Sequence, residues 1–146
     1  MDEERASFDD VARFFSMSSK ELRRSTRSAL ARLKVPTRGR TVAWKLVFEA
    51  IGLDGRISGQ ALQDVTRPML TAEEVAARNG IDPETIYRWH RENKNNLPRP
   101  VRLGPRGMRW LRAEIEGWEG IRDPVEFPRA PRKAAPFGAI KPNPSQ

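Results

Sequence analysis

The clearest alternation of apolar and polar positions lies between residues 70 and 92, where it predicts two short helices. Thr71 and Glu74 form a capping box, in which the hydroxyl accepts from the Glu74 N–H and the carboxylate reaches back to Thr71. Gly80 ends this first helix, because glycine tolerates a positive φ. An N-cap aspartate followed by Pro83 starts the second helix, which buries Ile86. Two helices joined by a tight glycine turn predict a helix-turn-helix.

A hairpin and a closing helix are predicted directly afterwards. Prolines favour an extended backbone over residues 97–103, and residues 104–107 have the composition of a turn. Residues 108–110 would form the returning strand. Apolar positions at helical spacing then predict a short helix over residues 111–118, with Trp110 and Trp118 as structural residues and Trp89 ambiguous. A hairpin in this position is a wing.

The first part of the chain has a similar order of elements. Residues 8–15 predict a helix behind Ser7, and a capping box of Ser18 and Glu21 opens a helix over residues 19–33. Residues 34–44 resemble the hairpin, and residues 45–51 resemble the closing helix. We therefore predict an internal duplication, and the alternative is a plain helical core with the same periodicity. The matched pairs are Val11 and Val75, Leu22 and Ile86, and Pro36 and Pro100, each 64 apart, with Trp44 and Trp110 66 apart.

These elements predict a mainly α fold with small β-hairpin wings, built from tandem winged helix-turn-helix domains. The domains would occupy residues 7–52 and 70–119, joined by a flexible linker over residues 53–69. Residues 120–146 contain six of the twelve prolines and carry five Lys/Arg against two Asp/Glu, so we expect a disordered basic tail. Its role would be solubility or non-specific contact with phosphates.

Charge and composition narrow the function classes. The net charge of +8 favours a polyanionic partner, either nucleic acid or an anionic membrane surface. No apolar run is long enough to span a bilayer and no secretory signal is visible, so we expect a cytoplasmic, nucleoid-associated protein. There is no cysteine, the only histidine is His90, and no HExxH, phosphate-binding loop or GxSxG motif occurs. We expect neither an enzyme nor a cofactor or metal site.

The candidate DNA contacts are basic and polar side chains on the second helix and the hairpin. The hairpin carries four arginines and no acid, whereas acids gather on the first and closing helices. For the basic cluster in the first part of the chain, the alternative to DNA contact is that these residues form a solvated helix face. The candidates are Thr85, Tyr87, Arg88 and Arg91 on the helix; Arg99, Arg102, Arg106 and Arg109 on the hairpin; and Lys20, Arg23, Arg24, Arg27, Arg38 and Arg40 in the suspected copy.

Residues 70–118 carry a family resemblance. The stretches LTAEEVA at 70–76, TIYRW at 85–89, LPRPVRLG at 97–104, RW at 109–110 and EIEGW at 114–118 resemble the AlpA-like and phage excisionase winged-helix group, relatives of the MerR DNA-binding domain. The resemblance implies a helix from Pro83 to about Glu92 in the major groove and a wing over residues 102–109 on the backbone or minor groove. Glu84 departs from the pattern, because an acid early in a reading helix either accepts from cytosine or repels phosphate.

We therefore expect a sequence-specific double-stranded DNA-binding protein of a phage or mobile element. It would act in transcription regulation or as an excisionase-type recombination directionality factor, with an integrase or RNA polymerase as candidate partner. One alternative is a DNA-recognition component of a packaging machine, like a small terminase subunit, but no long oligomerisation helix is predicted. Another is a winged-helix protein-interaction adaptor, which should lose the clustered arginines that this chain keeps. The oligomeric state and cooperativity on DNA stay open.

Overall fold

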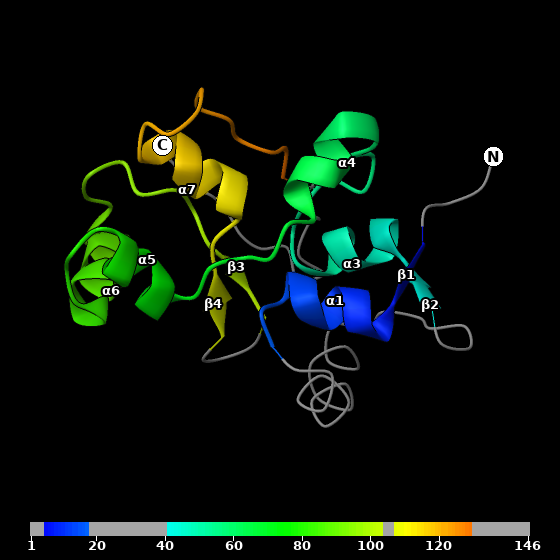
Figure 1. Cartoon of the computed structure of the whole chain (residues 1–146), viewed down its shortest axis with the longest axis horizontal. Helices are drawn as coiled ribbons and strands as arrows, with labels where there is room; N and C mark the ends of the chain where they lie inside the picture. Colours follow the sequence, from blue (N-terminus) through cyan, green and yellow to red (C-terminus); the bar gives the residue numbers. More distant parts are fainter. Residues whose placement is uncertain (1–4, 18–40, 104–106, 130–146) are drawn as a thin grey trace, which may run out of the picture.

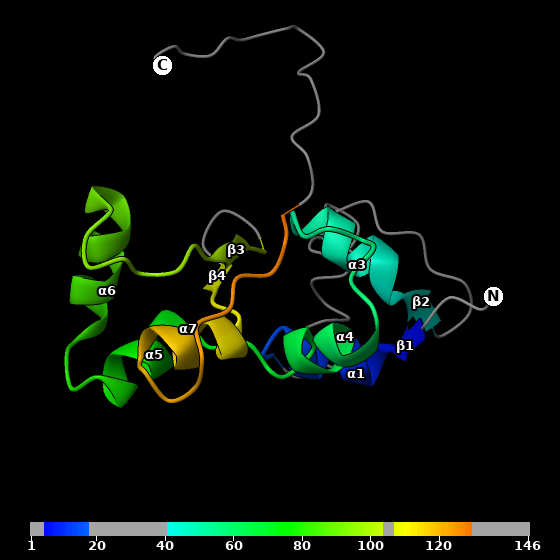
Figure 2. The same cartoon turned by 90° about the horizontal axis from the view of Figure 1, so that it is seen from above.

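The computed structural model describes residues 5–17, 41–103 and 107–129. The described part is mixed helical with two small antiparallel strand pairs, β1 with β2 and β3 with β4. Helices α5 and α6 lie at one end, β1, β2, α1, α3 and α4 lie toward the other, and β3, β4 and α7 lie between them (Figures 1 and 2). The elements in chain order are β1 Arg5–Ser7, α1 Phe8–Phe14, β2 Thr41–Ala43, α3 Trp44–Ala50, α4 Gly59–Val65, α5 Ala72–Arg78, α6 Pro83–Glu92, β3 Val101–Arg102, β4 Met108–Arg109 and α7 Arg112–Trp118.

The two helices predicted between residues 70 and 92 are confirmed as α5 and α6, which is compatible with a helix-turn-helix. The Glu74 backbone N–H donates to Thr71 Oγ1 at 3.1 Å, and the Thr71 N–H donates to Glu74 Oε1 at 2.9 Å, which completes the capping box. Gly80 has a φ of +69° in the turn. Pro83 is the first residue of α6. The N-cap residue Asp82 makes no side-chain hydrogen bond to the helix, and only its extended backbone is typical of an N-cap. Ile86 is fully buried against α5.

The hairpin and closing helix also form where the pattern predicts them. Val101 of β3 pairs with Arg109 of β4, and the ladder continues as Leu103 N–H donates to the Gly107 carbonyl at 2.7 Å. Trp110 exchanges two 2.8 Å backbone bonds with Leu70, which places the start of α7 beside the start of α5. This arrangement is compatible with a small winged helix-turn-helix.

The first half repeats part of this order. Ser7 and Asp10 form a capping box at the start of α1, and Ala6 pairs with Val42 just as Leu70 pairs with Trp110. Helices α1 and α5 start 64 residues apart, whereas α3 and α7 start 68 apart. Val42 therefore corresponds to Trp110, and the expected match between Trp44 and Trp110 is wrong. Of the hairpin expected over residues 34–44, residues 41–43 form β2, which pairs with β1, whereas residues 34–40 and the helix expected over residues 19–33 lie outside the described residues.

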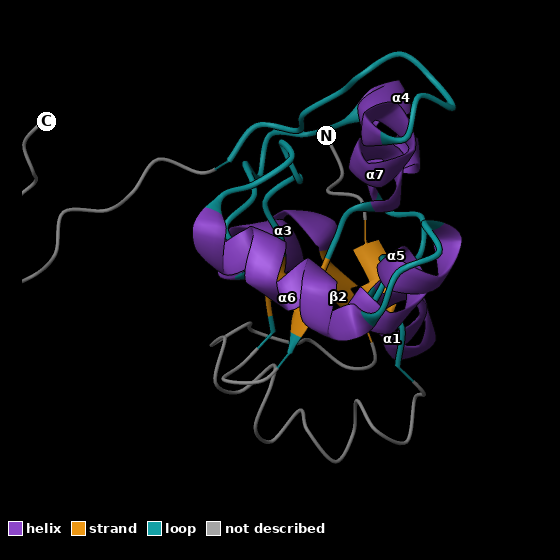
Figure 3. Ribbon diagram, turned by 90° about the vertical axis from the view of Figure 1, so that its left-hand side faces the viewer, coloured by secondary structure: helices purple, strands orange, loops and turns teal. Residues whose placement is uncertain are grey.

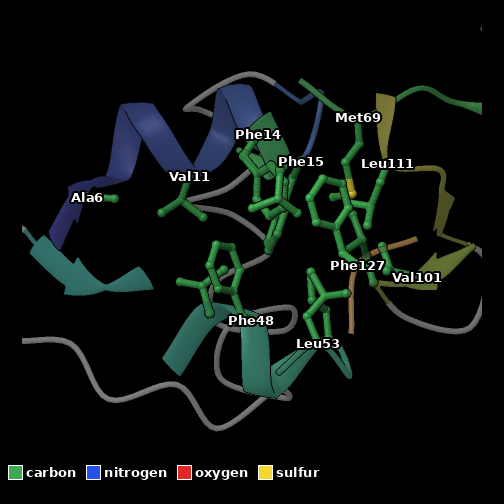
Figure 4. Packing of buried hydrophobic residues seen from close by; sticks show 14 of the residues in the cluster. Ala6, Val11, Phe14, Phe15, Phe48, Leu53, Met69, Val101, Leu111 and Phe127 are labelled. Atoms are coloured by element: carbon green, nitrogen blue, oxygen red, sulfur yellow. The ribbon is translucent and has the colours of Figure 1, made fainter. Parts of the chain in front are cut away.

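One hydrophobic core joins the two halves. Phe14, Phe15 and Leu53 from the first half pack with Met69 and Leu111 in the same buried cluster (Figure 4). A backbone bond crosses the junction, since the Met69 N–H donates to the Phe14 carbonyl at 3.0 Å. A second, smaller cluster around Trp110 lies under α5 and α6. The two halves therefore pack against each other through a shared core.

The flexible-linker expectation for residues 53–69 is wrong. This segment forms α4, and its Leu62 and Val65 side chains are buried. Arg67 then donates to both carboxylate oxygens of Glu116 on α7, at 2.9 and 2.6 Å. The apolar side chains of this segment cover a part of the core that the first half of the chain leaves uncovered.

The tail expectation is also wrong for residues 121–129, which we call the strap. Proline keeps the strap free of helix, as expected, but Phe127 is only 3% exposed and belongs to the main core. Pro124 lies over Gly117, where an added Cβ would approach the Pro124 Cα to 2.8 Å. The remaining residues 130–146 lie outside the described part of the chain. Within the described ranges, no helix is long and apolar enough to cross a membrane.

We predict that Trp110→Ala will lower the free energy of unfolding by about 3–5 kcal/mol, which is usual for emptying a buried tryptophan site. Trp110 is fully buried, and its Nε1–H donates to the Pro98 carbonyl at 2.9 Å. Urea titration followed by circular dichroism would measure the change. Trp118→Ala, at a half-buried site, should cost less, and an unchanged unfolding midpoint for Trp110→Ala would contradict the packing.

Candidate nucleic-acid interface

Helix α6 presents two arginines to solvent at the outer end of the molecule, where Figure 3 shows it nearest the viewer. Ile86 holds one side of the helix against α5, which leaves Arg88 and Arg91 exposed. The other two candidates on this helix are less accessible. Thr85 is half-buried, and Tyr87 packs in part against the smaller core.

The acid at the start of α6 has a local structural explanation. Glu84 is exposed in the first turn of the helix. A carboxylate there interacts favourably with the positive end of the helix dipole, typically by about 0.3–1 kcal/mol. An acid at this position therefore favours the helical structure of α6, although it departs from a purely basic reading helix.

The hairpin adds exposed cations beside α6. Arg99 precedes β3, Arg102 lies within it, and both are exposed. Partial burial lowers the pKa of His90 on α6, and the positive charge of Arg102 lowers it further. The charge of Arg102 thus reaches the C-terminal part of α6, where Arg91 is also exposed. Arg106, predicted at the tip of the wing, lies outside the described residues, as do Lys20, Arg23, Arg24, Arg27, Arg38 and Arg40.

Arg109 differs from the other arginines of the hairpin. Its Nε donates to the Phe15 carbonyl at 2.8 Å, and its Nη1 donates to the Met108 carbonyl at 3.0 Å. Its side chain is half-buried by these contacts. The structure thus uses Arg109 to tie β4 to the first half of the chain, and the predicted role in DNA contact is better assigned to its neighbours.

The acids of the closing helix are engaged by arginines from other segments. Glu116 binds Arg67, and Glu119 accepts from Arg78 at 3.1 and 2.6 Å. Glu114, only 3% exposed, pairs with Arg129 of the strap. The pKa of Glu116 is lowered chiefly by its hydrogen bonds from Arg67. These carboxylates therefore stabilise the packing around α7 and do not neutralise the arginines of α6 and β3.

The loop after α6 was not anticipated as a structured element. Asn93, Asn95 and Asn96 all have a positive φ, between 53° and 62°. Asparagine adopts this conformation more readily than most residues, so the run of asparagines was the available signal. Trp118 Nε1–H donates to the Asn95 carbonyl at 2.8 Å, and its ring meets Trp89 edge-on with centroids 6.4 Å apart. Trp89 is therefore a packing residue that helps hold α6 on α7.

Comparison with known families identifies the segment that carries this surface. Residues 69–122 match the family model described as prophage CP4-57 regulatory protein (AlpA). This segment is AlpA-like. It contains α5, α6, the hairpin and α7, and it excludes Phe15 and Arg129, which contact the hairpin from outside. The comparisons with curated proteins and with solved structures found no significant match.

Over the described ranges, no three His, Asp or Glu side chains are grouped so that they could hold an ion. The charged face consists of arginines on a helix and a hairpin, which can bind the oxygens of a phosphate backbone or the edges of bases.

We predict that the pKa of His90 lies below its usual value of 6.5 in the free protein and that Arg102→Gln raises it part of the way back. Burial disfavours the imidazolium, and the Arg102 guanidinium repels it. Because the unfolded chain then binds the proton more readily, the unfolding free energy should fall as the pH drops below 6.5. An NMR titration reads the only histidine directly. An unchanged pKa in Arg102→Gln would show that α6 and β3 are not adjacent.

Proposed function

We propose that this chain is a sequence-specific double-stranded DNA-binding regulator of a phage or mobile element, with no enzymatic activity and no cofactor. The observation that carries this proposal is that the AlpA-like segment has exposed arginines both on α6 and at strand β3 of the hairpin. Helix α6 would enter the major groove, with Arg88 reading a base edge, while Arg99 and Arg102 contact the backbone. The match of the AlpA-like segment to a prophage regulatory family supports it.

The proposal leaves two finer roles, transcription regulation and excisionase-type control of recombination. Both require a protein that marks a DNA site, with RNA polymerase or an integrase as the partner. A packaging role would call for a long oligomerisation helix, and the longest helix in the described ranges is α6 with ten residues. An adaptor role would not require the exposed arginines. The action on DNA would take place in the cytoplasm, at the nucleoid.

We predict that the full chain binds duplex DNA with strong dependence on salt. Neutralising roughly six phosphates should give a slope near −5 in a plot of log affinity against log salt concentration. Fluorescence anisotropy with a labelled duplex selected from a random pool would measure it between low and physiological salt. A slope close to zero would contradict the proposed function.

We also predict that Arg88 and Arg102 contribute differently. Arg88→Ala should cost about 1–3 kcal/mol of binding free energy and relax the preference at one base position, because the side chain would contact a base. Arg102→Ala should weaken all duplexes alike and flatten the salt slope by about one, because it would contact phosphate. Competition binding with duplexes altered at single positions separates the two effects.

Arg122→Gln is the matched control, because it removes one positive charge from the strap, where Arg122 pairs with Asp64 at 2.9 Å. It should leave both the sequence preference and the slope unchanged. If Arg88→Ala and Arg102→Ala lose sequence preference to the same degree, the placement of α6 in the groove is wrong.

A further inference from the structure

The backbone leading into the wing is held by an arginine outside the AlpA-like segment. Arg129 Nη2 donates to the Arg99 carbonyl at 3.0 Å, two residues before β3 begins. The same guanidinium donates to both carboxylate oxygens of Glu114, at 3.1 and 3.2 Å. One side chain therefore connects the buried carboxylate of α7 to the start of the hairpin.

The strap that carries Arg129 is itself fixed in place. The Phe127 N–H donates to Glu114 Oε2 at 2.8 Å, and the Phe127 ring lies in the main core. The Asp54 N–H donates to the Pro128 carbonyl at 2.9 Å, which attaches the strap to the first half of the chain. The strap therefore provides Arg129 with a rigid base.

The second strand of the hairpin is held independently. Arg109 of β4 donates to the Phe15 carbonyl at 2.8 Å, so strand β4 and the segment leading into β3 are each attached to parts of the chain outside residues 69–122. A hairpin joined to its domain only by its own two strands could tilt relative to α6. The two attachments restrict that tilt, because they hold opposite sides of the hairpin.

We propose that Arg129 is a positioning residue for DNA binding, which fixes the position of the wing relative to α6. The inference rests on the proposed function, because it assumes that Arg99 and Arg102 contact phosphates while α6 occupies the groove. Arg129 does not touch DNA in this account. It fixes the backbone from which those two side chains extend, so that both contacts form at once.

The burial of Glu114 determines how the proposal is tested. Removing Arg129 alone would leave a buried carboxylate without its partner, which is strongly destabilising. The double variant Glu114→Gln/Arg129→Met removes both charges and keeps similar side-chain volumes, a change that buried ion pairs often tolerate. It also removes the bond to the Arg99 carbonyl. Its matched control is Asp64→Asn/Arg122→Met, which neutralises the other ion pair of the strap with the same net charge.

The experiment uses the full chain and a duplex selected by the wild type from a random pool. We expect Glu114→Gln/Arg129→Met to flatten the salt slope by about two, the loss of two phosphate contacts, while the ranking of duplexes altered at single positions stays the same. The control variant should keep the wild-type slope. A merely structural defect would reduce the active fraction without changing the slope.

Each outcome decides one question. If the wild type binds no duplex, the proposed function fails. If the wild type binds with a steep slope and the double variant shows that same slope, the positioning role of Arg129 is overturned. If thermal melting shows that the double variant is unfolded, Arg129→Lys decides instead, because lysine keeps a charge for Glu114 but lacks the fork that also reaches the Arg99 carbonyl. A flattened slope in Arg129→Lys supports the proposal and an unchanged slope overturns it.

Discussion

The packing of Phe14 and Phe15 against Met69, Leu111 and Phe127 is the contact on which the rest of the structure depends. The two segments that share this core, residues 5–53 and 69–119, are each about fifty residues long, a size at which an isolated domain buries too little apolar surface to be more than marginally stable. Sharing one core removes that limit, because each half covers apolar surface of the other. Helix α4, through Leu62 and Val65, and the strap, through Phe127, bury apolar side chains in the same core.

This shared core also determines what the hairpin can do. The base of the wing lies where the two halves meet. There Arg109 donates a hydrogen bond to the Phe15 carbonyl, and Arg129 donates one to the Arg99 carbonyl. The exposed arginines Arg99 and Arg102 therefore extend from backbone next to these two attachments. A chain with a loosely attached wing would have to order it on binding, and that ordering would reduce affinity. The AlpA-like segment carries the exposed arginines, and two hydrogen bonds connect its hairpin region to Phe15 and Arg129 outside it.

The elements predicted correctly from sequence are those whose signals are local. The capping box at Thr71, the glycine at residue 80 and the proline at residue 83 specify their backbone conformations within a few residues, so α5 and α6 begin and end where expected. The linker and the strap were missed because burial of Leu62 and Phe127 depends on distant partners. The role of an arginine is still harder to predict from sequence, since the same side chain can bind a phosphate, as proposed for Arg102, or a backbone carbonyl, as Arg109 does. Only the fold distinguishes the two.

The measurement that tests the central claim most directly is an NMR titration of the isotope-labelled full chain with a short selected duplex. The account predicts that backbone amide shifts move in α6 and along β3, at Arg88, Arg91 and Arg102, while α4 and the strap around Arg122 stay unchanged. Shifts concentrated on α4 and the strap, with α6 unmoved, would contradict the assignment of the DNA-binding face.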